Sequence, residues 1–310
     1  MTGPEVSERA GIAHPFAKRV WLALGLPDIP DDVVEFNESD VEVLGALKVI
    51  LDQGYPEDGI LEVARAYGHA LSRVAQAEVR VFNKAFIVPM RDEAPTEEAL
   101  AARLDAIIPV LLDLLSKQMN LVHRRHLAIA LQEVTAVESD GATEEIAAGF
   151  VDLVDFSRVT QELEGEDLGH LVTRFESIAL ERCVALGGHV VKMIGDAVMF
   201  VSPDPDVALR VATAIVDDVE RDDKLPAARA GLDFGDAVAL GGDFFGRPVN
   251  VAARLTSFAR PGTVVVSEAL LETVPIPVQT SHIGRVRLHN VGHVRAFKVN
   301  SLDPPERAGT

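Results

Sequence analysis

Apolar residues in the first half of the chain recur every three or four positions, which is the spacing of one face of an α-helix. The residues at the ends of these segments support the same prediction. Asparagine, as at position 37, often caps the start of a helix, and glycine, as at position 54, often ends one. The segments with this pattern are 14–24, 38–53, 57–87 and 96–134. We therefore predict an all-α domain over residues 1–136.

A polar stretch, residues 137–145, is predicted as a linker, and the pattern then changes. Short apolar runs bounded by turn residues alternate with helical segments over residues 146–310. The predicted strands are 146–153, 189–194, 197–201, 227–232, 237–240, 263–266, 282–288 and 294–299. The predicted helices are one that follows the acidic turn after residue 153, then 165–185, 204–219 and one that begins near Pro248. This order predicts an α/β domain.

One stretch of the last long helix, residues 107–115, is apolar on nearly all sides. A helix of that kind is buried on several sides. We interpret the stretch as part of the core of a helical bundle and of a dimer interface. The alternative is a pocket for an acyl chain, which makes a lipid or another small effector a second hypothesis for this domain.

Composition narrows the classes of function. A net charge of −19 disfavours a nucleic-acid surface, because phosphate contacts need basic side chains, and it argues against a DNA-binding role for the helix–turn–helix-like residues 51–60. Cys183 has no second cysteine to pair with, so we expect a reducing, cytoplasmic compartment. No apolar run is long enough for a transmembrane segment, and the first residues carry no apolar signal core.

Two aspartates stand at predicted strand ends beside tight turns. Asp152 precedes an acidic turn, and Asp196 lies in the Gly-Asp turn of the hairpin 189–201. If the strands lie side by side, the two carboxylates suit Mg²⁺ or Mn²⁺, and two such cations suit an in-line displacement at phosphorus. Aspartate is also common in turns because its side chain caps backbone groups, so this pair alone does not decide the function.

A third stretch, residues 242–255, adds a second kind of chemistry. Pro248 fits the first turn of a helix, where its missing N–H costs nothing. Asn250 and Arg254 are four residues apart and share one helix face. An amide beside a guanidinium can stabilise negative charge that builds up on a phosphoryl group.

At these residues the chain resembles the class III nucleotidyl cyclases, over about residues 146–299. The helical half resembles the N-terminal regulatory domain of soluble actinobacterial-type adenylate cyclases. The resemblance implies a class III catalytic domain with a mixed sheet and flanking helices, and conversion of ATP to cyclic AMP and pyrophosphate. Six polar positions define the active site of that family, and all six find a match here.

The resemblance also implies a role for each matched residue. Asp152 and Asp196 would bind two divalent cations, Mg²⁺ or Mn²⁺, with the backbone carbonyl of Leu153 as a further ligand. The other implied roles are adenine recognition by Lys192 and Asp243, transition-state stabilisation by Asn250 and Arg254, and phosphate binding by the backbone N–H groups around Phe156 and Ser157. Members of the family work as dimers, which implies a homodimer whose metal ligands come from one chain and whose other four side chains come from its partner.

Three positions depart from the family pattern. Asp155 stands where many members have Gly, Asp236 stands where some have a phosphate-binding Arg, and His289-Asn290 stands where Lys-Gly is frequent. Positive charge near the phosphates is therefore reduced, which predicts low or conditional activity.

These departures keep other functions open. Protonation of His289, or of His123 and His126 in the long helix, is one hypothesis for control by pH, against the simpler reading that all three are solvated surface groups. Besides a working cyclase, the chain could be an ATP-binding sensor with little turnover. A third alternative is a lipid- or protein-binding module whose α/β half serves only for dimerisation.

Overall fold

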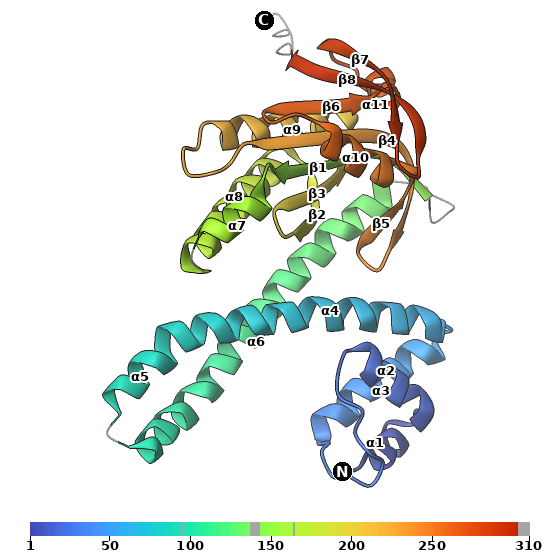
Figure 1. Ribbon diagram of the computed structural model, residues 1–310. Coiled ribbons are helices and arrows are strands. Elements are labelled where there is room, and N and C mark those ends of the chain that lie inside the picture. Colours follow the sequence, from blue (N-terminus) through green and yellow to red (C-terminus); the bar gives the residue numbers. More distant parts are fainter. Residues whose placement is uncertain (95, 137–142, 164, 303–310) are drawn as a thin grey trace, which may run out of the picture. The chain divides into compact units, whose positions relative to one another are not determined.

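The structure, a computed structural model, describes residues 1–94, 96–136, 143–163 and 165–302. The chain divides into two compact units, Met1–Glu138 and Ser139–Thr310 (Figure 1). The first unit is helical and the second is built on a sheet. Residues 137–142 of the predicted linker and the last eight residues lie outside the described part.

The helical unit contains the four predicted helices and two that were not predicted, one at its start and a short one over residues 88–93. Its elements are α1 (Gly3–Ala10), α2 (His14–Ala23), α3 (Glu38–Asp52), α4 (Glu57–Phe82), the π-helical turn η1 (Asn83–Ile87), α5 (Val88–Glu93) and α6 (Glu97–Ala136). Helix α1 was not predicted, although Thr2 and Glu5 form a capping box at its start. The single helix predicted over 57–87 ends at Phe82 and continues as the π-helical turn.

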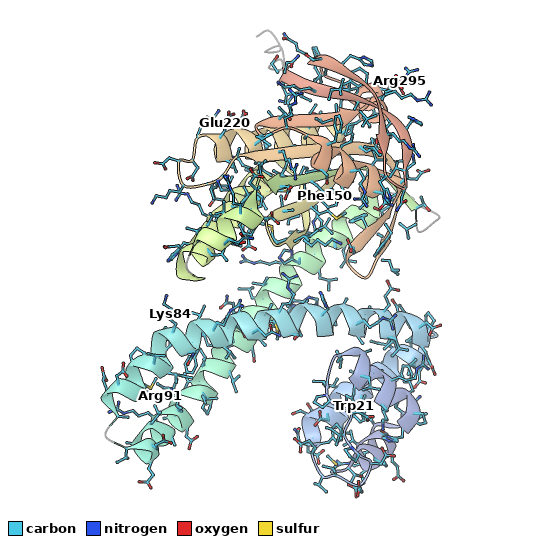
Figure 2. The ribbon with its side chains drawn as sticks, viewed as in Figure 1. Trp21, Lys84, Arg91, Phe150, Glu220 and Arg295 are labelled. Atoms are coloured by element: carbon cyan, nitrogen blue, oxygen red, sulfur yellow. The ribbon has the colours of Figure 1, made fainter. Side chains whose placement is uncertain are left out.

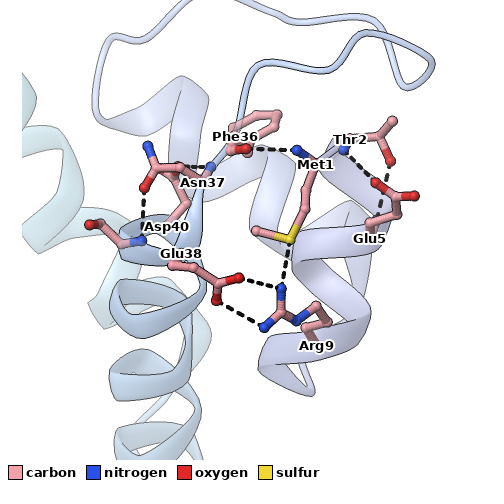
Figure 3. A network of polar contacts seen from close by, with 9 residues as sticks. Met1, Thr2, Glu5, Arg9, Phe36, Asn37, Glu38 and Asp40 are labelled. Atoms are coloured by element: carbon pink, nitrogen blue, oxygen red, sulfur yellow. Dashed lines mark hydrogen bonds and ion pairs between the residues drawn. The ribbon is translucent and has the colours of Figure 1, made fainter.

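Polar contacts hold the first residues against the start of α3 (Figure 3). The amino group of Met1 donates a hydrogen bond to the carbonyl oxygen of Phe36 at 2.7 Å. Arg9 binds both carboxylate oxygens of Glu38 at 2.7 and 2.8 Å. Asn37 caps α3, as its sequence position predicted. Exposed ion pairs of this kind add little stability, so their main effect is to orient α1 on α3.

The core of the helical unit lies among α1, α2, α3 and the first turns of α4. Trp21 stacks on Phe36 at a ring distance of 4.4 Å, and Figure 2 shows Trp21 among these short helices. The buried residues of this core are Val6, Ile12, Phe16, Ala17, Val20, Leu44, Ile60, Leu61 and Ala64. Gly68 lets α4 approach the backbone of Leu24, since a Cβ at Gly68 would lie 2.5 Å from its carbonyl.

The apolar stretch of α6 is exposed in the single chain. Val110, Leu112 and Leu114 are 70%, 59% and 60% exposed. The prediction that residues 107–115 form the core of a bundle within the chain is therefore wrong for these side chains. Helix α6 does contact α4, because the hydroxyl of Tyr67 lies 2.9 Å from Nε2 of His123.

The second unit contains one mixed sheet, and eight strands belong to it in the described part. Their bounds are β1 (Thr143–Leu153), β2 (His189–Ile194), β3 (Ala197–Ser202), β4 (Ala228–Leu240), β5 (Asp243–Gly246), β6 (Thr263–Ser267), β7 (Val278–Leu288) and β8 (Gly292–Leu302). The strand order is β2-β3-β1-β4-β6-β8-β7, with β5 paired to β4. Strands β4 and β6 are parallel and the other pairs are antiparallel. The predicted α/β class and mixed sheet are thus confirmed.

Helices cover the two faces of the sheet unequally (Figure 1). The helices are α7 (Phe156–Glu162), α8 (Gly165–Leu186), α9 (Pro205–Glu220), α10 (Arg247–Phe258) and α11 (Glu268–Thr273). Alternate residues of β1 point to opposite faces, so Ala147 and Val151 pack with α8 and α9, whereas Ala148 and Phe150 pack on the α10 side. The α10 face is the one that carries Asp152.

Several predicted boundaries differ from the structure. The strands predicted over 227–232 and 237–240 are one strand, β4, which continues through Gly235. Residues 143–145, assigned to the linker, extend β1 because they pair with 236–238 of β4. Strand β5 and helix α11 were not predicted.

Among the described residues, we find no helix that is both long and apolar enough to cross a membrane.

Candidate active site

Two aspartates from neighbouring parts of the sheet lie close together. Asp152 is near the end of β1 and pairs in register with Ala197, the residue after Asp196. Asp196 lies in the turn between β2 and β3, where Gly195 has a φ of 64° that favours glycine. The backbone N–H of Leu153 donates to the carbonyl oxygen of Asp196 at 3.1 Å and holds this turn against β1. The hairpin and the strand predicted from sequence therefore bring both carboxylates together.

The two carboxylates influence each other. Burial, together with the nearby charge of Asp152, raises the pKa of Asp196 above its usual range. The positive charge of Arg229 partly offsets this effect. A bound cation would relieve both the burial cost and the repulsion, which is the electrostatic environment of a metal site.

The donor set fits a hard divalent cation. It offers two carboxylates and the backbone carbonyl of Leu153, all oxygen ligands. No cluster of three or more His, Cys, Asp or Glu side chains suited to a metal occurs in the described part of the chain. Such a sparse set suits Mg²⁺ or Mn²⁺, which complete their coordination with water and with phosphate oxygens.

Helix α7 begins directly after this region. Its N-cap residue, Asp155, has a φ of 58°, in the left-handed region that favours glycine. Glycine adopts this backbone most readily, which agrees with the Gly that the resemblance implies at this position. Phe156 and Ser157 form the first turn, where backbone N–H groups lack partners within a helix. The side chain of Ser157 lies outside the described part.

Lys192 and Asp243 are brought together from strands far apart in sequence. Nζ of Lys192, on β2, forms an ion pair with Oδ2 of Asp243, the first residue of β5. The backbone N–H of Phe244 donates to the other carboxylate oxygen of Asp243 at 2.9 Å. Both side chains are partly exposed, so the pair can exchange its mutual contact for a ligand.

Asn250 and Arg254 lie on exposed positions of α10. The amide of Asn250 donates to the carbonyl oxygen of Gly246 at 3.0 Å, and Arg254 follows one turn later. Helix α10 sits directly on β4 because Gly231 has no side chain, and a Cβ there would lie 2.2 Å from the backbone nitrogen of Thr256. The helix predicted from Pro248 is therefore present, with both polar side chains facing outward.

The six predicted residues thus form three groups within the sheet unit. The structure pairs Lys192 with Asp243 and brings Asp152 close to Asp196, while Asn250 and Arg254 share one helix face. Of the departures noted in the sequence, Asp236 is exposed on β4, and Asn290, in the turn between β7 and β8, has a left-handed φ of 63°.

Sequence reasoning missed two charged residues of β4 on the same face as Asp152. Arg229 pairs with Asp152, and Asp233 is fully buried, with Ser267 donating to its Oδ1 and Arg247 lying 3.5 Å from its Oδ2. Burial raises the pKa of Asp233 to about 6. The available signal was two charged residues four positions apart, on one face of a largely apolar strand.

Two family models match the chain, one for each unit. The model for the adenylate cyclase regulatory domain matches residues 1–128. The model for the adenylate and guanylate cyclase catalytic domain matches residues 139–301. The second match covers more than half of the chain, including all six polar positions.

Whole-chain relatives agree with these models. An adenylate cyclase of Streptomyces coelicolor is 31% identical, over 86% of this chain and 70% of the relative. A pH-sensitive adenylate cyclase of Mycobacterium tuberculosis is 32% identical, over 95% of this chain and 77% of the relative. A solved structure of a bacterial light-regulated adenylyl cyclase has the same fold, with a TM-score of 0.52 and 21% identity over 64% of this chain and 65% of that one.

Proposed function

This chain belongs to the adenylate and guanylate cyclase catalytic family, and from that premise we propose that it is an adenylate cyclase that converts ATP to 3′,5′-cyclic AMP and pyrophosphate. The choice of ATP rests on the ion pair between Lys192 and Asp243. Adenine presents an acceptor at N1 and a donor at its 6-amino group, which a lysine and an aspartate side by side complement. Guanine presents the reverse pattern, so the same pair disfavours it.

Asp152, Asp196 and the carbonyl of Leu153 are proposed to hold two divalent cations, Mg²⁺ or Mn²⁺. Bound there, the cations would lower the pKa of the ribose 3′-hydroxyl and neutralise charge on the triphosphate. The first-turn N–H groups of Phe156 and Ser157 are proposed to bind the terminal phosphates. The support is the oxygen-only donor set and the mutual repulsion of the two carboxylates.

Asn250 and Arg254 are proposed to stabilise the charge that develops when the 3′-oxygen attacks the α-phosphorus and pyrophosphate leaves. Both are exposed, and so are the apolar side chains Ile194, Leu240 and Phe245 of the hairpins that carry Asp196 and Asp243. Exposed apolar groups beside polar site residues fit a surface that a second copy covers. We therefore propose a homodimer in which one chain binds the metals and its partner supplies Lys192, Asp243, Asn250 and Arg254.

The helical unit is proposed to regulate this activity, as its match to a cyclase regulatory domain suggests. Control by pH is one form, because one relative is pH-sensitive and the contact between Tyr67 and His123 joins α4 to α6. A change in activity between pH 5.5 and 8 is expected to weaken in His289→Gln and in the double replacement of His123 and His126. If neither variant alters the pH profile, these histidines are surface groups only.

A lipid or other small effector, and a cytoplasmic location, stay predictions. The pocket beside Trp21 and Phe36 in the helical unit has a volume of about 30 Å³. That volume suits a water molecule and not an acyl chain, and the pocket lies away from residues 107–115, where the sequence suggested an acyl chain.

The direct test is cyclic AMP formation from ATP, with Mn²⁺ and with Mg²⁺, at pH 6 and pH 8. We expect turnover by the wild-type chain and a loss of at least about 100-fold in Asp152→Ala. Asp223→Ala, an exposed aspartate of the same unit, is the matched control and should leave turnover unchanged. ATP binding without turnover under all four conditions would instead favour the sensor.

A further inference from the structure

Arg229 stands directly opposite a proposed metal ligand. It lies on β4 in register with Asp152 of β1, so both side chains emerge on the same face of the sheet. The two side chains are 26% and 21% exposed. In a strand whose neighbouring residues are Ala228 and Ala230, an arginine needs a specific partner.

The guanidinium of Arg229 forms hydrogen bonds with two different parts of the sheet unit. Its Nε and Nη2 groups donate to Oδ2 of Asp152 at 3.1 and 2.8 Å. Its Nη1 group donates to the carbonyl oxygen of Ser257 at 3.2 Å, in the last turn of α10. That carbonyl is one of the helix-end groups that lack a partner within the helix. Arg229 therefore links the carboxylate to the end of α10.

Both contacts to the carboxylate end on one oxygen. With Oδ2 held by two N–H groups, Asp152 has a defined orientation, and among the described residues Oδ1 is the oxygen left for another ligand. Ligating carboxylates commonly owe their orientation to hydrogen bonds of this kind from a neighbouring residue. A lysine at this position would carry the same charge but lacks the planar fork that makes three directed bonds.

We propose that Arg229 is a positioning residue for the divalent cations: it orients Asp152 for metal binding and ties it to α10. This inference rests on the proposed function, because it requires Asp152 to be a metal ligand. The role depends on the directed bonds of the guanidinium and not on its charge alone. It follows that Lys cannot replace Arg229, although Lys would suffice to balance the charge of Asp152.

The test is Mn²⁺ affinity of the full chain without nucleotide, measured by electron paramagnetic resonance of free Mn²⁺, for wild type, Arg229→Gln and Arg229→Lys. We expect about 10- to 100-fold weaker binding in both variants. The Mn²⁺ concentration needed for half-maximal cyclic AMP formation should rise in parallel. Arg174→Gln removes another arginine that pairs with an aspartate, Asp222, and should change neither quantity.

The outcomes separate the inference from the function on which it rests. Wild-type turnover with Mn²⁺ affinity unchanged in Arg229→Gln, or restored in Arg229→Lys, overturns the positioning role and leaves the cyclase proposal intact. A wild-type chain that neither binds Mn²⁺ nor forms cyclic AMP overturns both. Circular dichroism shows whether each variant is folded, and Arg229→Lys, which keeps the aliphatic stem and the charge, carries the test if Arg229→Gln does not fold.

Discussion

The sheet unit and the helical unit bury their apolar side chains to different extents. In the sheet unit, the large side chains of Phe175, Phe200 and Leu232 are fully enclosed between the sheet and its helices. Among the described residues of the helical unit, the buried core lies among α1, α2, α3 and the start of α4. Beyond that point, side chains such as Val81 and Val110 are 68% and 70% exposed.

Each unit leaves a different kind of surface exposed in the single chain. The sheet unit has a closed core but an open site, with Asn250 and Arg254 facing outward. The described part of the helical unit has exposed apolar side chains along α4 and α6. Large exposed apolar surfaces usually mark an interface. A second copy of the chain could complete the proposed site of the sheet unit and cover the apolar surface of the helical unit. The homodimer is therefore central to the proposed function.

Matched glycine substitutions break the packing of each unit separately. Gly231→Ala and Gly68→Ala each place a Cβ within 2.5 Å of backbone atoms, against α10 and Leu24 respectively. We expect a loss of about 4 kcal/mol of unfolding free energy in the affected unit, since backbone must move. Trp21 is the one tryptophan of the chain, so its fluorescence reports on the helical unit alone.

Only Gly68→Ala should shift the fluorescence transition, and only Gly231→Ala should abolish cyclic AMP formation at temperatures where Trp21 is still native. Gly169→Ala in α8 is the control, because nothing lies within 4 Å of its added Cβ. That variant should gain up to about 1 kcal/mol from helix propensity. If the Gly231→Ala chain unfolds like the wild type, α10 does not pack as closely on β4 as described.

Asp233 makes the stability of the sheet unit depend on pH. Burial raises its pKa to about 6 in the folded chain, above the ordinary value of 3.8, so the folded state binds the proton more tightly than the unfolded state does. The stabilising effect is full below about pH 4 and is lost as pH rises through about 6, a change of about 3 kcal/mol. Relative to Asp233→Asn, the wild type should therefore become less stable over this range.

Denaturant unfolding of both chains at pH 4, 5, 6 and 8, followed by a probe of the sheet unit, measures this difference. Asparagine keeps the size of Asp233 and an oxygen for Ser267, so packing is conserved. Asp236→Asn, at an exposed position of the same strand, should show no comparable dependence. Parallel curves for wild type and Asp233→Asn would mean that the buried carboxylate does not titrate in this window.

A charged side chain on the exposed face of α6 tests whether this apolar surface forms the interface of the proposed dimer. Val110→Glu places a carboxylate on the surface that we expect a second copy to cover, at a cost of about 2 kcal/mol per site. Sedimentation should show more monomer at a given concentration, with lower cyclic AMP formation as the proposed composite site is lost. Val34→Glu alters a valine that is 72% exposed in the loop before α3, and it should change neither. Unchanged assembly of Val110→Glu would place the interface elsewhere.

The smallest expected effect concerns the start of α7. Asp155→Gly relieves a left-handed backbone and should stabilise the sheet unit by about 1 kcal/mol or less. It also removes a negative charge near the proposed phosphate position, so the KM for ATP should fall. Asn290→Gly relieves a similar backbone without a change of charge and should affect stability only. Equal KM changes in the two variants would exclude the charge effect.

Much of the fold was predictable because local signals and tertiary packing agree. The hairpin around Gly195 and Asp196 combines two apolar runs with a turn dipeptide, and the structure contains it with nearly the predicted bounds. Strand β5 was missed because its four residues, Asp243–Gly246, are too few to show a period. Helix α1 was missed although its Thr-x-x-Glu cap is visible in the sequence.

What the sequence did not predict depends on partners far away along the chain. The contact of Arg229 with Asp152 joins residues 77 positions apart, and it follows only from the register of β1 and β4. The pairing of Lys192 with Asp243 was expected only through the resemblance to a family. The apolar stretch around Val110 was interpreted as part of a bundle core and of a dimer interface, because the pattern records only that a side chain avoids water and not what covers it.

The most direct test of the composite site mixes two inactive chains. Asp152→Ala lacks a proposed metal ligand and Arg254→Ala lacks a proposed transition-state residue, so each alone should form almost no cyclic AMP. In an equal mixture, half of the dimers contain one chain of each kind, and each of these has one complete site, so we expect about a quarter of wild-type activity. A mixture as inactive as its components, although mixed dimers are detected, would contradict a site shared between two chains.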